Sequence, residues 1–289
     1  MTTPRDATAA AIRVRARLFA LQRELAGTRE LELQVPDGAA IEDVWLALVA
    51  RHPVLAPGRP SVRFARNGEY ADATDPVRDG DEIAFIPPVS GGAGTDRGAD
   101  GGTGEPGRAE PGTPDAANRI LEVRADAFDD SILTELTRRL ATPADGGVVG
   151  FLGRTRESAG TPAPGQEAEA ARHVGRRVES LSYEAHEPMA LRVLEAIADE
   201  IESRFGVRRV AIVHRLGDVP LGAPSIAVVA AAAHRDEAFR AARYAIDETK
   251  ARAPIWKAEQ FADGHVWIGE PARSGPPGGG PTPPGKERA

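Results

Sequence analysis

Alternating apolar and polar residues mark the first predicted structure in the chain. Over residues 12–18, apolar side chains alternate with arginines, and residues 31–35 repeat this pattern after a turn near Gly27. A period of two is typical of a half-buried strand. The two segments therefore predict a β-hairpin.

The next segment predicts a helix followed by short strands. Apolar residues at 41, 44, 45 and 48 follow helical spacing, and this helix must end before Pro53. Short apolar runs at 62–65 and 83–86 follow, with turn signals at Asn67-Gly68 and Asp79-Gly80. Two strands, a helix and further strands predict a β-grasp, ubiquitin-like domain over residues 12–92. Residues 1–11 before it are polar, Ala-rich and predicted to be a disordered tail.

Residues 93–118 predict a flexible linker. They contain seven glycines, three prolines and no large apolar side chain, so they cannot bury enough surface to offset the entropy of ordering. A flexible chain of this length spans roughly 28 Å root-mean-square. Residues 273–289 are also dominated by Gly and Pro and predict a second disordered tail.

Residues 119–272 predict a second domain of mixed α+β type. Helical spacing over 132–140 predicts a helix that Asp129 or Asp130 caps, and residues 158–177 predict a mobile surface loop. Further segments are predicted as strands at 120–123, 148–152 (a buried one), 181–183, 207–213 and 226–232, and as helices at 190–205 and 239–246, the last stopping before Pro254.

Composition narrows the functional classes. A net charge of −7 and a pI near 5.5 argue against a general nucleic-acid or anionic-membrane surface, and no apolar run approaches the roughly 18 residues that span a bilayer. The absence of cysteine excludes disulfides, thiolate metal sites and a cysteine nucleophile, which suits a cytoplasmic protein. The six histidines show no paired ligand spacing, so no metal is predicted. No nucleotide-binding glycine motif occurs, so any ATP chemistry must belong to a partner.

Several separated motifs carry a family resemblance. The predicted β-grasp domain ends in Pro87-Pro88-Val89-Ser90-Gly91-Gly92. The second domain contains Gly153-Arg154-Thr155-Arg156, Tyr183-Glu184-Ala185-His186, Val213-His214-Arg215-Leu216-Gly217, Ala233-His234-Arg235 and Lys250-Ala251-Arg252-Ala253-Pro254-Ile255-Trp256-Lys257. In this order they resemble molybdopterin synthase, with the small sulfur-carrier subunit over 12–92 and the large catalytic subunit over 119–272 fused in one chain.

The resemblance implies a fold and a reaction. It implies an α+β protein with an N-terminal β-grasp domain and a C-terminal α/β-hammerhead-type domain. The family converts cyclic pyranopterin monophosphate into the dithiolene molybdopterin by inserting two sulfurs. Each sulfur arrives as a thiocarboxylate on the small subunit's last glycine, after a separate ATP-dependent activating enzyme has adenylated it. By resemblance Gly92 is that glycine, a sulfur donor is a further partner, and the catalytic domains pair as a dimer.

The resemblance also assigns candidate substrate-binding residues. Arg154, Thr155 and Arg156 match the family's substrate-binding turn, and His234 with Arg235 matches a second binding pair. Arginine suits a phosphorylated substrate because its planar fork bonds phosphate oxygens in pairs. Without the resemblance, such arginines are usually solvated loop ends.

Two lysines are the candidate catalytic residues. Lys250 closes a helix and Lys257 follows across Pro254, so a turn and a short strand could return both ammonium groups to one pocket. By resemblance both are active-site lysines that also bind substrate. Lys250 is the general acid/base or intermediate-stabilising group, while Lys257 holds the carrier's terminal carbonyl or a substrate anion.

Four further positions are candidates for substrate contact or for the pocket wall. Ala258 and Glu259 match the last substrate-contacting stretch, although some relatives would have a larger polar or basic residue at Ala258. Phe151 and Met189 fit a pocket wall or a core role equally well.

The position of Gly92 inside the chain requires a processing step. While Gly92 is amide-bonded to Ala93, it has no carboxylate to adenylate. We therefore expect a protease to cut between them. Three alternatives remain at this point: a catalytic domain served by a separate carrier, a non-catalytic ubiquitin-like interaction module, and a carrier for another sulfur pathway such as thiamine synthesis.

Overall fold

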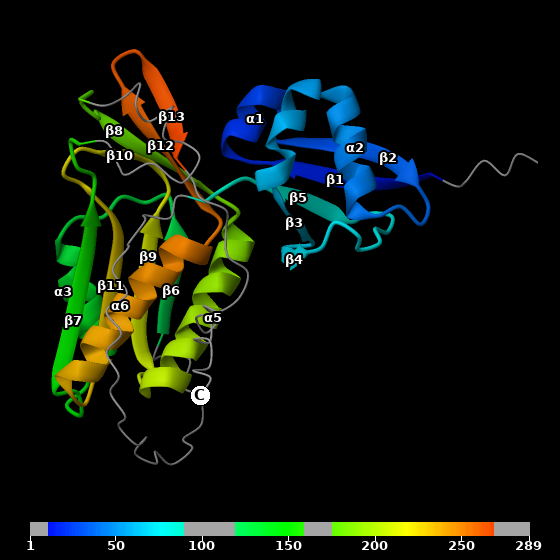
Figure 1. Cartoon of the computed structure of the whole chain (residues 1–289). Helices are drawn as coiled ribbons and strands as arrows, with labels where there is room; N and C mark the ends of the chain where they lie inside the picture. Colours follow the sequence, from blue (N-terminus) through cyan, green and yellow to red (C-terminus); the bar gives the residue numbers. More distant parts are fainter. Residues whose placement is uncertain (1–10, 90–118, 159–174, 269–289) are drawn as a thin grey trace, which may run out of the picture.

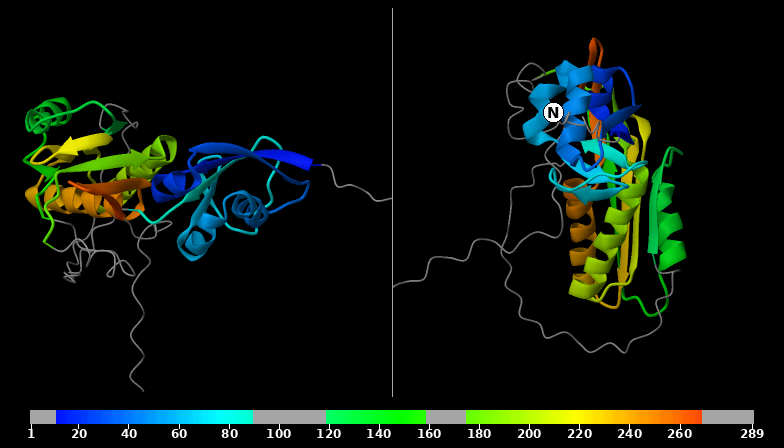
Figure 2. Two further views of the ribbon diagram at one scale, coloured as in Figure 1. Left: turned by 90° about the horizontal axis from the view of Figure 1, so that it is seen from above. Right: turned by 90° about the vertical axis from the view of Figure 1, so that its right-hand side faces the viewer.

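The structure, a computed structural model, describes residues 11–89, 119–158 and 175–268. Gly92, the linker over 93–118, the tail over 273–289 and most of the loop over 158–177 lie outside the described residues. We call residues 11–89 the N-terminal domain and residues 119–268 the C-terminal domain. The two lie end to end, with the N-terminal domain against one end of the C-terminal domain (Figures 1 and 2).

The N-terminal domain is a five-stranded sheet crossed by a helix. The strand order is β2-β1-β5-β3-β4, in which β1 and β5 run parallel and the other neighbours antiparallel. Helix α2 (Ile41–Arg51) buries the predicted stripe of Ile41, Val44, Trp45 and Leu48 against the sheet. The strands are β1 (Ala11–Leu18), β2 (Glu30–Pro36), β3 (Arg63–Arg66), β4 (Glu69–Ala71) and β5 (Glu82–Ile86).

The connection between β1 and β2 differs from the predicted tight turn. The two strands pair antiparallel as expected, but helix α1 (Ala20–Ala26) lies between them and ends at Gly27, whose φ of 69° is left-handed. Leu, Gln, Glu, Arg and Ala in this segment favour a helix, and a glycine in this conformation ends one. A 3₁₀ segment, η1 (Pro53–Ser61), follows α2 and was not predicted.

The C-terminal domain has a central sheet covered on both faces. The sheet order is β6-β9-β11-β7, with α3 (Ser131–Leu140) on one face and α5 (Glu187–Phe205) and α6 (Arg235–Arg252) on the other (Figure 2). The strands are β6 (Arg119–Arg124), β7 (Gly147–Arg154), β9 (Arg209–Arg215) and β11 (Pro224–Ala232). Every residue of β11 is buried, as expected for a strand enclosed by helices on both sides.

A second, smaller sheet joins this domain to the N-terminal one. Its order is β10-β8-β12-β13, formed by β8 (Ser180–Ala185), β10 (Gly217–Pro220), β12 (Ile255–Phe261) and β13 (Gly264–Ile268). Strands β10 and β13 were not predicted. Strand β12 follows the proline that ends α6, as the lysine argument required, and contacts α1 of the N-terminal domain.

The structure corrects two local predictions and decides between the two candidates of a third. Strand β7 is an edge strand and not a buried one, because among the described residues it pairs with β11 alone, and it leaves Val148 and Phe151 exposed. Phe239 follows the helical spacing of α6 but is 61% exposed. Asp129 accepts hydrogen bonds from the backbone and hydroxyl of Ser131 and so caps α3, whereas Asp130 makes no such bond.

The described residues contain neither a membrane-spanning helix nor a metal-binding group. In these ranges no helix is both long and apolar enough to cross a bilayer. No group of three or more His, Asp or Glu side chains in the same ranges is arranged to hold a metal ion.

Candidate active site and domain interface

A cluster of cations forms where α6 ends and β12 begins. Lys250 lies in the last turn of α6, and Lys257 lies in β12 beyond the proline turn. Part of the Lys250 side chain is exposed, but the surrounding protein removes water from its ammonium group and so lowers its pKa. The charges of Lys257 and Arg156 lower this pKa further. Asp247 acts in the opposite direction. The structure thus brings Lys250, Lys257 and Arg156 together.

Lys257 is held by an acidic neighbour on its own strand. Its Nζ lies 3.4 Å from Oε1 of buried Glu259. Residues two apart in a strand share one face, so the ion pair follows from the sequence of β12. Across the ladder, Lys257 is in register with Tyr183 of β8, which places this tyrosine beside the lysine.

Two aromatic rings lie behind the cations. The rings of Tyr183 and His214 meet edge to face with centroids 4.9 Å apart, and the Tyr183 hydroxyl lies 3.2 Å from that of Ser225. Burial lowers the pKa of His214 to about 4, and the charge of Lys250 contributes. Burial also raises the pKa of Tyr183. Both rings are therefore neutral near pH 7, and they form an uncharged wall behind the lysines.

Two members of the predicted substrate-binding turn are occupied by structural contacts. Arg154 donates to the carbonyl of Gly222 at 2.6 Å and forms an ion pair with Asp130. Thr155 is buried, and its backbone N–H donates to the carbonyl of Ala223 at 3.1 Å. These bonds fasten the end of β7 to the turn before β11 and leave Arg156, exposed, near the lysines.

The second predicted binding pair lies far from the cations within one chain. His234 and Arg235 are at the start of α6, whereas Lys250 is in its last turn. Fifteen residues of helix separate Arg235 from Lys250, which is about 22 Å. Ala258 is buried, and strand alternation directs it to the opposite face from Lys257.

The opposite face of β12 forms the contact with the N-terminal domain. The rings of Trp256 and Phe19 stack with centroids 4.7 Å apart, and Trp256 Nε1 donates to the carbonyl of Pro87 at 3.0 Å. Met189 and Val89 are buried in the same apolar cluster, Val89 being only 1% exposed. Met189 thus has an interface core role, while Phe151 is exposed on β7.

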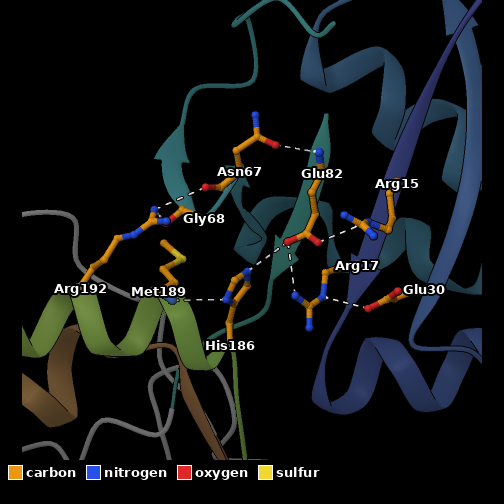
Figure 3. A network of polar contacts seen from close by, with 9 residues as sticks. All are labelled: Arg15, Arg17, Glu30, Asn67, Gly68, Glu82, His186, Met189 and Arg192. Carbon is orange, nitrogen blue, oxygen red and sulfur yellow. Dashed lines mark hydrogen bonds and ion pairs between the residues drawn. The ribbon is translucent and has the colours of Figure 1, made fainter. Parts of the chain in front are cut away.

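A polar network surrounds this apolar contact. Glu82 of β5 lies between Arg17 of β1, at 3.3 Å, and His186 at the start of α5, at 3.6 Å (Figure 3). Burial lowers the pKa of His186, as does Arg17, whereas Glu82 raises it. Arg192 of α5 donates to the carbonyl of Gly68 at 2.9 Å (Figure 3).

The sequence did not predict the roles of Tyr183, Ser225, His214 and Trp256, which depend on contacts between distant segments.

Residue usage in the sequence supports the choice of the two lysines. The chain has 36 lysines and arginines, but lysine occurs only at 250, 257 and 286. Arginine does not release its proton near neutral pH, whereas an enclosed lysine can. Two lysines seven residues apart in an arginine-rich chain thus point to proton chemistry.

Comparisons with known proteins agree with this division. The MoaE protein family model matches residues 126–252, and the ThiS family model matches residues 16–92. The molybdopterin synthase catalytic subunit of Oryza sativa subsp. indica is 45% identical over 148 residues, covering 51% of this chain and 68% of the relative. That of Pyrococcus abyssi is 36% identical over 140 residues, covering 48% and 85%.

Two solved structures are also similar. Molybdopterin synthase from Staphylococcus aureus has 32% identity and a TM-score of 0.43, covering 52% of this chain and 96% of that one. Small archaeal modifier protein 1 of H. volcanii has 32% identity and a TM-score of 0.25, covering 27% and 99%.

Fold and comparisons together define a fused protein with an N-terminal ubiquitin-like, sulfur-carrier-type domain and a C-terminal MoaE domain. The chain belongs to the family of molybdopterin synthase catalytic subunits. Its role therefore lies in molybdenum cofactor biosynthesis. The resemblance and the mixed α+β fold class with an N-terminal β-grasp domain are confirmed.

Proposed function

We propose that this chain is a molybdopterin synthase, a sulfurtransferase that moves sulfur from a Gly92 thiocarboxylate to cyclic pyranopterin monophosphate. The observation that carries the proposal is that the last described residues of the N-terminal domain pack against β12. Val89 is buried beside Trp256, and Lys257 is the next residue of that strand. Gly92 lies three residues beyond Val89, a reach of at most about 10 Å.

The cation cluster supports the chemistry of transfer. The thiocarboxylate sulfur attacks a carbon of the pterin side chain, and the new carbon–sulfur bond replaces a carbon–oxygen bond whose oxygen leaves that carbon and takes up a proton or stays on the phosphate. Water then cleaves the bond between the glycine carbonyl carbon and sulfur, so that Gly92 is left as a carboxylate and the sulfur stays on the pterin. Lys250, with its lowered pKa, is suited to move a proton, and Lys257 to stabilise negative charge on oxygen. Arg156 is the arginine best placed to bind the substrate phosphate.

The remaining predicted residues have supporting roles. Arg154 and Thr155 hold the turn that presents Arg156, and Glu259 orients Lys257. A backbone contact could survive at Ala258, where the side chain faces away.

We place His234 and Arg235 in the site of a second copy. The exposed edge of β7, with Val148 and Phe151, and exposed Phe239 near the start of α6 support pairing of two C-terminal domains. Pairing through this surface would bring each His234 and Arg235 toward a partner. Sedimentation of a Val148→Lys, Phe239→Lys variant tests this, because the pairing predicts a monomer.

We further propose that a protease cuts between Gly92 and Ala93 before the first turnover. The activating enzyme requires a free carboxylate, and a separate sulfur donor then replaces one oxygen. The buried contact between the domains supports this carrier role over an idle module or a catalytic domain served only by another carrier.

Mass spectrometry of protein from its native host tests the processing step. We expect a fragment ending at Gly92, with one oxygen replaced by sulfur in the loaded state. A matched chain with an uncleavable junction should make no dithiolene without another carrier. If that chain is active by itself, the proposed mechanism is wrong.

A further inference from the structure

A buried carboxylate of the C-terminal domain faces a backbone N–H and two guanidinium groups of the N-terminal domain. Glu184 of β8 is 9% exposed. Its Oε2 accepts the backbone N–H of Ala20 at 3.3 Å and lies 3.4 Å from Arg23, and its Oε1 lies 3.3 Å from Arg29. These three partners all belong to the N-terminal domain.

Strand register places this carboxylate beside the apolar centre of the interface. Glu184 is directly opposite Trp256 in the β8–β12 ladder, and the Trp256 ring stacks on Phe19. Ala20, next to Phe19, has a φ of 47°, in the left-handed region that a non-glycine residue adopts rarely. The N–H that Glu184 accepts thus comes from an unusual backbone corner, which adds a shape requirement to the charge requirement.

We infer that Glu184 is the residue that determines which carrier domain can dock, by selecting a carrier with two guanidinium groups beside the Phe19–Ala20 corner. The inference rests on the proposed function, in which docking delivers sulfur. The occupant is a β-grasp carrier of this charge pattern, here the domain of the same chain.

Selection follows from the cost of burying a charge. Before docking, water can solvate the Glu184 carboxylate. A carrier with neutral or acidic residues in place of Arg23 and Arg29 would bury the carboxylate without a counter-charge, which is strongly unfavourable. The same residue therefore attracts the matching carrier and rejects others.

Two neighbouring polar pairs also cross the interface, and in both the acidic residue belongs to the N-terminal domain. His186 faces Glu82 at 3.6 Å and His265 faces Glu24 at 2.9 Å, so acidic carrier residues meet histidines of the C-terminal domain. A cleft of about 250 Å³ beside Glu184, lined by Arg23, Arg29, His265 and Trp267 among others, admits water.

Hydrogen exchange of the full-length chain tests the inference. The Ala20 amide is protected by Glu184 only in the docked state, so exchange of residues 18–27 reports docking. We expect Glu184→Arg, and separately the pair Arg23→Glu with Arg29→Glu, to speed this exchange about tenfold or more. The triple variant that combines Glu184→Arg, Arg23→Glu and Arg29→Glu restores opposite charges and should recover much of the protection. Glu184→Gln, which keeps the hydrogen-bond acceptor, should fall between wild type and Glu184→Arg.

Matched controls separate docking from folding. Glu187→Arg makes the same charge change as Glu184→Arg, at an exposed position three residues away. Arg13→Glu is the matching control for the arginine substitutions, at an exposed position of the N-terminal domain. Both should leave exchange of residues 18–27 unchanged, and amides of β9 and β11 should stay protected in every variant. The inference is overturned if Glu184→Arg leaves this exchange at the wild-type rate, or if the triple variant is no better protected than the single one. This readout needs no sulfur transfer, so it can fail or succeed independently of the proposed reaction.

Discussion

The two faces of the β8–β12 strand pair have opposite tasks, although their residues alternate along the same strands. One face presents Lys257 and Tyr183 to the cation cluster, and the other presents Trp256 and Glu184 to the N-terminal domain. Successive side chains of a strand point to opposite faces. Docking and chemistry are therefore separated by a single residue in each strand.

The β8–β12 strand pair couples docking to the proposed chemistry. Both faces are fixed by the same ladder of hydrogen bonds, so a carrier seated on Trp256 packs against the residue that adjoins Lys257 in the strand. A one-residue slip in β12 would exchange the two faces and abolish both functions.

The largest effect is expected on the cation face. Lys250→Ala should slow single-turnover sulfur transfer to cyclic pyranopterin monophosphate about 10²- to 10⁴-fold, because the proton-transferring group is lost. Lys250→Arg keeps the charge but not the labile proton, so it should stay within about tenfold of the alanine variant. Arg240→Ala, exposed on the same helix, is the control. An alanine variant with wild-type transfer would remove Lys250 from the mechanism.

The wall behind the lysines should make stability sensitive to acid. The pKa of His214 is lowered to about 4, so below the ordinary histidine pKa the unfolded chain binds a proton that the folded chain does not. Stability should then fall by about 3 kcal/mol between pH 6.5 and pH 4. Urea unfolding of His214→Gln should lose this part of the pH dependence, whereas His52→Gln should keep it. Identical slopes for wild type and His214→Gln would contradict the account.

On the docking face, Trp256→Ala should release the N-terminal domain. The variant loses the stack on Phe19 and the bond to Pro87, and exchange of residues 18–27 should rise about 10- to 100-fold. Trp256→Phe keeps a ring without the N–H donor and should show a smaller rise. Unchanged exchange in the alanine variant would mean that the ring does not hold the domains together.

The smallest effect concerns the coupling between the two lysines. The charge of Lys257 lowers the pKa of Lys250, so Lys257→Met should raise it. If the Lys250 ammonium donates a proton, the falling limb of the pH–rate profile should move to higher pH by about one unit or less. Arg240→Met, exposed on α6 and ten residues before Lys250, should leave that limb in place. A shift to lower pH would contradict the expected sign.

Local patterns predicted most elements but not their surroundings. The stripe at 41, 44, 45 and 48 identified α2, and the alternation over 12–18 identified β1. The same patterns predicted β7 as a buried strand and did not show that Phe239, at helical spacing in α6, is exposed, because periodicity says which residues share a face but not what covers it.

The candidate site divides in the same way. The Lys250 and Lys257 motif could be recognised in the sequence, because a helix end, a proline and a short strand return the chain locally. The occupation of Arg154 by Gly222 and Asp130, and the distance from Arg235 to Lys250, could not be predicted. Both depend on how segments distant in sequence pack together.

The sequence by itself determined the two-domain plan, and it was enough to predict a carrier-type ending at Gly92 and two lysines for proton chemistry, because these depend on composition, local spacing and motifs. Only the tertiary structure decided that Glu184 and Trp256 face the N-terminal domain while Tyr183 and Lys257 face away. The reason is physical: which face of a strand is buried, and by which partner, depends on contacts between residues more than 150 positions apart.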